Sequence, residues 1–181
     1  SKDMKDRILR FISIYFCCLP LVGSAQITGD FSSPSNLYKE GREMFLQKNY
    51  TAAAPLLKTF VEQTRTDDHL MEAEYMLACL SYEWQDKNCI EQINTYLEKY
   101  PDNPYANRLY ALMASAYFFE EKYDEALAMF GSSNLEWLGN EERDDMTYRK
   151  AISYLTIGNV NQAAIWFETL RGSSTKYEKD C

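Results

Sequence analysis

The sequence predicts an all-α fold built from repeated helical hairpins, and three observations support this prediction. From Asn36 onward the apolar residues recur at spacings of three and four, as they do in amphipathic helices, and no stretch alternates as a strand would. Glycine and proline, 7 and 5 of 181 residues, are too scarce for a turn-rich β-sandwich. A small residue also returns at a regular interval within the helical stretches: Gly41, Ala78, Ala114 and Ala151 are 37, 36 and 37 residues apart.

Residues 1–25 have the layout of a secretory signal peptide. Four basic residues precede or enter a mostly apolar run from Ile8 to Val22, and small residues up to Ala25 follow it. The run is shorter than the ~20 residues that a membrane-spanning helix needs, so we expect cleavage after Ala25 rather than a retained anchor. Cys17 and Cys18 leave lipid attachment open as an alternative, although their neighbours match the lipoprotein processing motif poorly.

We expect residues 26–35 to form a polar lead-in and residues 36–181 to form the helical domain. Short polar breaks interrupt the helical periodicity, and loops of that size join antiparallel neighbouring helices. The breaks fall at residues 47–49, 86–88, 120–122 and 158–159.

Three of the four repeat units carry residues of the same class 3, 9, 12 and 16 positions after the small residue. These residues are Met44, Tyr50, Ala53 and Leu57; Tyr117, Tyr123, Ala126 and Phe130; and Tyr154, Val160, Ala163 and Phe167. The second unit has Tyr82, Cys89, Ile93 and Tyr96, which fit only if its register shifts by one residue. We expect the small residues to let paired helices approach closely, and each hairpin to cover the apolar face of the one before it.

This pattern resembles a tetratricopeptide repeat (TPR) of the exported kind, and the run Tyr-Pro-Asp-Asn-Pro-Tyr at residues 100–105 strengthens the resemblance. Outer-membrane assembly lipoproteins and cell-envelope coordinator proteins have a similar joint between repeats. The junction after Ala25 is also similar to that of many secreted Bacteroidetes proteins. The resemblance covers residues 36–181 and implies a right-handed α-solenoid of four hairpins plus the start of a fifth, although the interval exceeds the usual ~34 residues.

Two segments depart from the repeat. Residues 131–133 (Gly-Ser-Ser) should end the second helix of the third unit early, and residues 135–138 should form a short extra element that packs Trp137 into the joint. Residues 174–181 resemble the approach to another first helix, so we expect the natural chain to continue beyond Cys181. An uncovered last hairpin predicts a possible homodimer through its apolar residues, which are Trp166, Phe167 and Leu170.

The charge balance favours a protein partner. Removing residues 1–25 takes away four of the 19 basic and two of the 27 acidic residues, which changes the net charge from −8 to −10. Phosphate backbones and anionic lipid surfaces repel such a chain. We therefore expect a protein or peptide partner, no nucleic acid, and no membrane span in the mature chain.

Few residues suggest chemistry. Three cysteines remain after cleavage, and a Cys79–Cys89 bridge is possible, but two buried thiols are the favoured interpretation. The single histidine, His69, excludes motifs that need two, and no glycines have the spacing of a phosphate-binding loop. Asp67 and Glu72 beside it are assigned to a helix N-terminus rather than to a metal. We expect no catalytic residue, no cofactor and no metal ion, and hence no enzyme.

The resemblance places the first helix of each hairpin on the concave side of the solenoid. Aromatic and arginine side chains projected onto that side are candidates for a partner-binding groove. They are Tyr38, Arg42, Phe45, Tyr75, Tyr82, Arg108, Phe118 and Tyr148. The alternative is that some of these rings pack against the neighbouring second helix.

The sequence thus predicts a non-catalytic protein–protein interaction scaffold that is exported to the periplasm or the outer membrane. Two alternatives stay open. The chain could be the sensory region of a longer membrane-bound regulator, or the TPR region of an envelope enzyme whose catalytic domain lies downstream.

Overall fold

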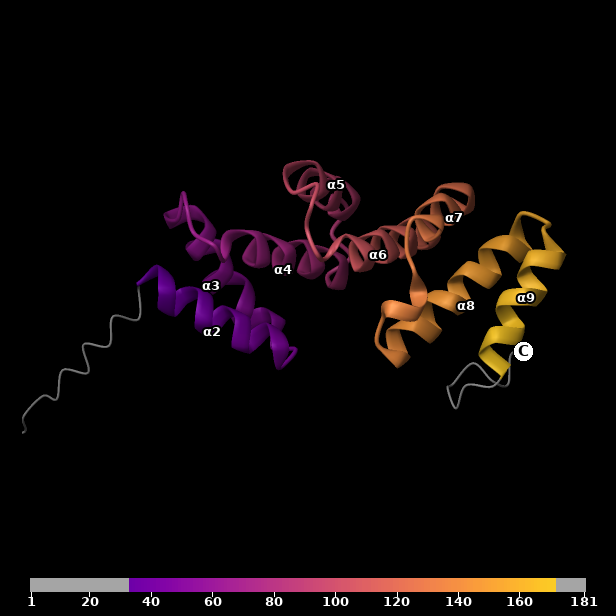
Figure 1. Cartoon of the computed structure of the whole chain (residues 1–181), viewed down its shortest axis with the longest axis horizontal. Helices are drawn as coiled ribbons and strands as arrows, with labels where there is room; N and C mark the ends of the chain where they lie inside the picture. The colour runs from indigo at the N-terminus through magenta and orange to yellow at the C-terminus, as the bar shows by residue number, and fades with distance from the viewer. Residues whose placement is uncertain (1–32, 172–181) are drawn as a thin grey trace, which may run out of the picture. The chain divides into compact units, whose positions relative to one another are not determined.

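The structure, a computed structural model, describes residues 33–171, and this part of the chain contains α-helices and one 3₁₀ turn but no strand (Figure 1). The all-α class is confirmed for these residues. The helices are α2 (Pro34–Leu46), α3 (Tyr50–Gln63), α4 (Leu70–Glu83), α5 (Cys89–Lys99), α6 (Ala106–Phe119), α7 (Tyr123–Gly131), α8 (Asn140–Thr156) and α9 (Val160–Arg171), with the 3₁₀ turn η1 at Leu135–Trp137. The predicted signal peptide, most of the lead-in and residues 172–181 lie outside the described residues.

The helices pair as four successive hairpins, α2–α3, α4–α5, α6–α7 and α8–α9. The second helix of each hairpin packs on the first helix of the next, so α3 contacts α4, α5 contacts α6 and α7 contacts α8. The first helices α2, α4, α6 and α8 also contact one another in order, and no pair of second helices makes comparable contact. Side chains of successive first helices can therefore meet on a common surface. Among residues 33–171, none of the helices combines the length and apolar character needed to cross a bilayer.

The turn inside each hairpin is the same in all four units. A residue with positive φ lies seven positions after each small residue: Lys48, Gln85, Glu121 and Gly158. The amide after it donates to a carbonyl five residues back, as from Asn49 to Met44 at 2.8 Å and from Asn159 to Tyr154 at 2.8 Å. This is the Schellman arrangement, which satisfies the last carbonyls of a helix. The predicted repeat is thus present in the backbone as well as in the side chains.

The small residues of the repeat lie in the core, as predicted. Gly41, Ala78, Ala114 and Ala151 are all buried. A Cβ added to Gly41 would lie 2.9 Å from the Cγ and Cδ2 atoms of Leu57, so only glycine allows α2 and α3 to approach this closely.

The predicted register shift of the second hairpin is confirmed. Its buried residues on α5 are Cys89, Ile93 and Tyr96, whereas α3 buries Ala53, Leu57 and Phe60. Measured from the preceding small residue, each buried position on α5 comes one residue earlier than on α3.

Three side-chain predictions need correction. Trp137 was expected to pack into the joint, but its side chain is 77% exposed, and Leu135 and Leu138 are buried instead. Residues three apart share a face in a 3₁₀ turn, so the two leucines face inward together and Trp137 does not. Val160, expected in the core, is 61% exposed, and Leu170, expected on an open apolar face, is buried. Other predictions hold: α7 ends at Gly131, and the thiols of Cys79 and Cys89 are free and buried.

Candidate binding groove on the first helices

Polar side chains connect the first helices in a repeated register. Tyr38 of α2 donates its hydroxyl to a carboxylate oxygen of Glu72 on α4, and the Tyr75 hydroxyl on α4 accepts from Nη1 of Arg108 on α6 at 2.8 Å. Both tyrosines lie three residues before the small residue of their unit, and both partners lie six residues before the next one. Arg42 adds a second contact to Glu72, at 2.9 Å. The hairpins are therefore joined by hydrogen bonds as well as by apolar packing.

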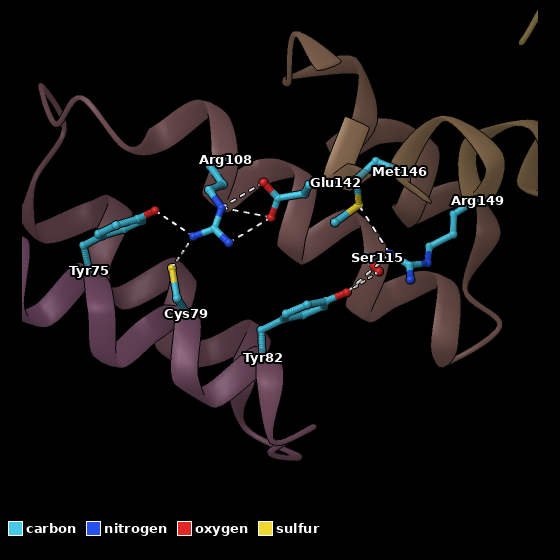
Figure 2. Close-up of polar contacts among 8 residues, drawn as sticks. All are labelled: Tyr75, Cys79, Tyr82, Arg108, Ser115, Glu142, Met146 and Arg149. Carbon is cyan, nitrogen blue, oxygen red and sulfur yellow. Dashed lines mark hydrogen bonds and ion pairs between the residues drawn. The ribbon is translucent and has the colours of Figure 1, made fainter. Parts of the chain in front are cut away.

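Arg108 is the centre of the largest network (Figure 2). Its Nε donates to both carboxylate oxygens of Glu142 on α8, at 2.9 and 3.0 Å, and its Nη1 donates to Tyr75 and, at 3.3 Å, to the Cys79 sulfur. Burial of the guanidinium opposes its charge, but the hydrogen bond and ion pair with Glu142 outweigh this and raise the pKa of Arg108. Burial raises the pKa of the Cys79 thiol to about 11, so it stays protonated at neutral pH. One arginine thus holds three successive first helices together.

A second network surrounds Tyr82 near the end of α4. Its hydroxyl lies 2.8 Å from the hydroxyl of buried Ser115 on α6 and 3.5 Å from Nη1 of Arg149 on α8 (Figure 2). The Arg149 guanidinium lies 5.0 Å from the ring centroid of Phe119 and 3.9 Å from a carboxylate oxygen of Asp145. Its charge is therefore less closely paired than that of Arg108, whose carboxylate partner is at 2.9 Å.

Two pockets open on either side of this second network. The central pocket, of about 540 Å³, lies between the α2–α3 turn, α4, α6 and the N-terminal part of α8. The lateral pocket, of about 300 Å³, lies between the α4–α5 turn, the end of α6 and α8. Tyr82, Glu83 and Arg149 line both pockets. We call the two adjoining pockets the groove.

Only some of the eight predicted residues line the groove. Tyr82 and Arg108 line it, and the Tyr75 hydroxyl accepts a hydrogen bond from Arg108. Tyr38 and Arg42 meet at Glu72, in a separate pocket near His69. The predicted residues that line pockets are thus divided between the groove and the pocket near His69.

The three other predicted groove residues pack against aromatic neighbours. Phe45 contacts Tyr50 of α3, with ring centroids 5.7 Å apart, and Phe118 contacts Tyr123 of α7 at 5.8 Å. The Tyr148 ring lies 6.1 Å from that of Phe167 on α9. These contacts are the alternative that the sequence left open, in which a ring packs against the neighbouring second helix.

Several groove residues were not predicted, above all Arg149, Glu142 and Glu83. Glu142 lies in the first turn of α8, and its carboxylate is paired with Arg108. The sequence does contain a signal for this pair. Glu142 has the opposite charge to Arg108 and follows it by 34 residues, the same distance that separates Tyr38 from Glu72.

The carboxylate of Glu72 also has a shifted pKa. Burial acts to raise its pKa, but hydrogen bonds from Tyr38 and Arg42 outweigh burial and lower it.

The helix-terminal role of Asp67 is supported. Its carboxylate accepts from the backbone amide of His69 at 2.7 Å and lies 2.8 Å from the His69 ring nitrogen Nδ1. Within residues 33–171, no group of three or more His, Cys, Asp and Glu side chains is placed to hold a metal ion.

Comparison with protein-family models, with curated proteins and with solved structures finds no match to this chain. The groove therefore has to be interpreted from its own geometry and chemistry.

Proposed function

We propose that this chain is a non-catalytic, TPR-like scaffold of the cell envelope that binds an extended segment of a partner protein in the groove. The observation that carries the proposal is the groove itself, whose walls come from three successive first helices, α4, α6 and α8. A surface assembled from successive repeats is long in one direction, which suits an extended segment rather than a compact small molecule.

The side chains of the groove favour recognition of a protein segment. Tyrosine and arginine are enriched among the residues that contribute most to protein–protein binding. Tyr82 and Arg108 are already fixed by hydrogen bonds to neighbouring helices, at 2.8 Å for Tyr82 with Ser115 and 2.9 Å for Arg108 with Glu142. Such side chains lose little conformational freedom when a partner binds, which favours affinity.

The proposed compartment follows from the sequence. The basic, apolar and small-residue layout of residues 1–25 supports export, and the net negative charge of the chain disfavours nucleic acid as the partner. A periplasmic or outer-membrane location is part of the proposal.

Site-specific photo-crosslinking tests the proposal. A photoreactive amino acid placed at Phe119, on the wall of the lateral pocket, should give a discrete adduct with an envelope protein, and Tyr82→Ala, which removes a ring that lines both pockets, should abolish that adduct. The matched control places the same amino acid at Glu62, an exposed residue of the second helix α3. Equal adducts from both positions, or an adduct that persists in a folded Tyr82→Ala variant, would contradict a partner site in the groove.

A further inference from the structure

We infer that the groove selects a segment with two cationic side chains, one seated in each pocket. This inference rests on the proposed function and specifies the chemistry of the partner. The residues on which it depends are the carboxylates of the two pockets, the exposed ring of Phe119, and the partition that Tyr82 and Arg149 form between the pockets.

Carboxylates outnumber cations in both pockets. The central pocket has Glu83, Glu141, Glu142 and Asp145 against Lys48, Arg108 and Arg149. The lateral pocket has Glu83, Asp86 and Glu120 against Lys87 and Arg149; Glu120 is paired with Lys122 at 2.7 Å, so Glu83 and Asp86 are the carboxylates that face this pocket without an ion pair among residues 33–171. The net charge of the whole chain, −8, has the same sign and would steer a cationic segment toward the groove.

The internal ion pairs leave carboxylates available to a ligand. The charge of Arg108 is paired with that of Glu142, at 2.9 Å. Glu83 and Glu141 are exposed, and no ion pair within residues 33–171 involves either of them. Glu83 lines both pockets, so its carboxylate can contribute to the binding of either cation.

Aromatic side chains in the pockets add a second attraction for cations. Phe119 is 55% exposed in the lateral pocket, and the guanidinium of Arg149 already lies 5.0 Å from its ring centroid. The ring thus accepts a cation on one side, and cation–π attraction to a ligand is available on the part that stays open. Tyr50 and Tyr82 line the central pocket and offer rings there.

The partition between the pockets determines how many cations bind and where. Arg149 lies on the shared wall, so a cation placed between the pockets would be repelled, whereas cations on either side meet carboxylates. A partner with two basic side chains at a suitable spacing should therefore bind better than one with a single basic side chain. An anionic segment would meet repulsion from the carboxylates of both pockets.

Short labelled alanine-based peptides test this inference by fluorescence anisotropy with the protein that begins after Ala25. The set has two lysines at varied spacing, one lysine, or two glutamates. We expect one two-lysine spacing to bind at least about tenfold more tightly than the single-lysine peptide, a difference of ~1.4 kcal/mol. The two-glutamate peptide should not bind, and added salt should weaken the two-lysine complex.

A matched pair of variants assigns the binding to the groove. Glu83→Gln should weaken the two-lysine peptide about fivefold or more, whereas Glu62→Gln on α3 makes the same charge change outside both pockets and should leave it unchanged. Circular dichroism confirms that both variants are folded. Tight binding of the glutamate peptide, or an equal effect of the two variants, would overturn the inference.

The failure of this inference can be told apart from the failure of the proposed function. If no peptide binds but the Tyr82-dependent adduct at Phe119 still forms, the two-cation chemistry is wrong and the groove remains a partner site. If neither binding nor the adduct is observed, both proposals are wrong.

Discussion

The first and second hairpins have the same kind of turn between their helices, but their second helices pack differently. Lys48 and Gln85 both adopt positive φ, at 59° and 51°, seven residues after their small residue. Ala53, the first buried residue of α3, follows Lys48 by five residues, as in the third and fourth hairpins. Cys89 follows Gln85 by only four residues. In the second hairpin, the segment from the positive-φ residue to the first buried residue of the second helix is therefore one residue shorter.

This difference changes how closely the paired helices pack. Helix α3 lies so close to α2 that a Cβ on Gly41 would contact Leu57. Helices α4 and α5, by contrast, contact each other less extensively and border an open surface pocket of about 400 Å³, whose lining includes Ala78, Tyr96 and the ion pair of Lys99 with Glu74 at 2.7 Å. Among residues 33–171, the buried Tyr96 hydroxyl has no hydrogen-bond partner. The hairpin with the shifted register is thus also the less closely packed of the two.

The comparison also bears on function, because the α4–α5 turn forms one wall of the lateral pocket. Gln85, Asp86, Lys87 and Cys89 all line it. The less completely packed hairpin is therefore the one that borders the proposed partner site, and groove surfaces that adjust to a partner are commonly drawn from the less stable parts of a fold.

The largest expected effect comes from truncating one core residue on each second helix. Leu57 on α3 and Ile93 on α5 are both fully buried. We expect Leu57→Ala to lower the free energy of unfolding by about 4 kcal/mol and Ile93→Ala by about 2 kcal/mol, because a loosely packed site collapses more readily around the deletion. Urea unfolding measures both, and a larger loss for Ile93→Ala would contradict the comparison.

A smaller effect is expected from adding a methyl group at the α2–α3 contact. Gly41→Ala should gain helix propensity but force the Leu57 side chain to move, for a net loss of about 1–2 kcal/mol. The matched control is Gly131→Ala, at the end of α7, where an added Cβ meets no atom within 4 Å. Thermal unfolding should show a lower Tm for the first variant and an unchanged or higher Tm for the second. Equal Tm values for both variants would mean that the close approach is not needed.

The smallest effects come from two tyrosine hydroxyls. Tyr96→Phe removes a buried hydroxyl without a partner and should stabilise the protein by about 0.5 kcal/mol, whereas Tyr38→Phe removes the hydrogen bond to Glu72 and should cost about 1 kcal/mol. Because that bond helps to lower the pKa of Glu72 in the folded state, its contribution is present at neutral pH and is lost as the pH falls below about 4.5. Urea unfolding at neutral and acidic pH checks both points. A destabilised Tyr96→Phe, or a Tyr38→Phe loss that does not shrink in acid, would count against them.

Sequence reasoning predicted the hairpins, the buried small residues and the shifted second unit, because these depend on local periodicity and on one repeated interval. It could not predict the inward face of the η1 turn. It placed Trp137 in the joint between repeats, whereas Leu135 and Leu138 are the buried residues there. A turn of three residues has too few positions to reveal a period.

The candidate site was predicted only in part, because its contacts join residues about one repeat apart. Arg108 and Tyr82 were recognised as residues of the first helices. Their pairing with Glu142 and Ser115 depends on how α4, α6 and α8 are placed against one another, which local helix propensity does not determine. For the same reason, Arg149 was missed although it borders both pockets.

Hydrogen–deuterium exchange with and without the two-lysine peptide tests most directly whether the partner site adjoins the less stable of the first two hairpins. In the free protein, the amides of α5 should exchange faster than those of α3, and the peptide should slow exchange in the α4–α5 turn and around Arg149. The account would be contradicted if α5 were as protected as α3 in the free protein and the peptide left the exchange of the α4–α5 turn unchanged.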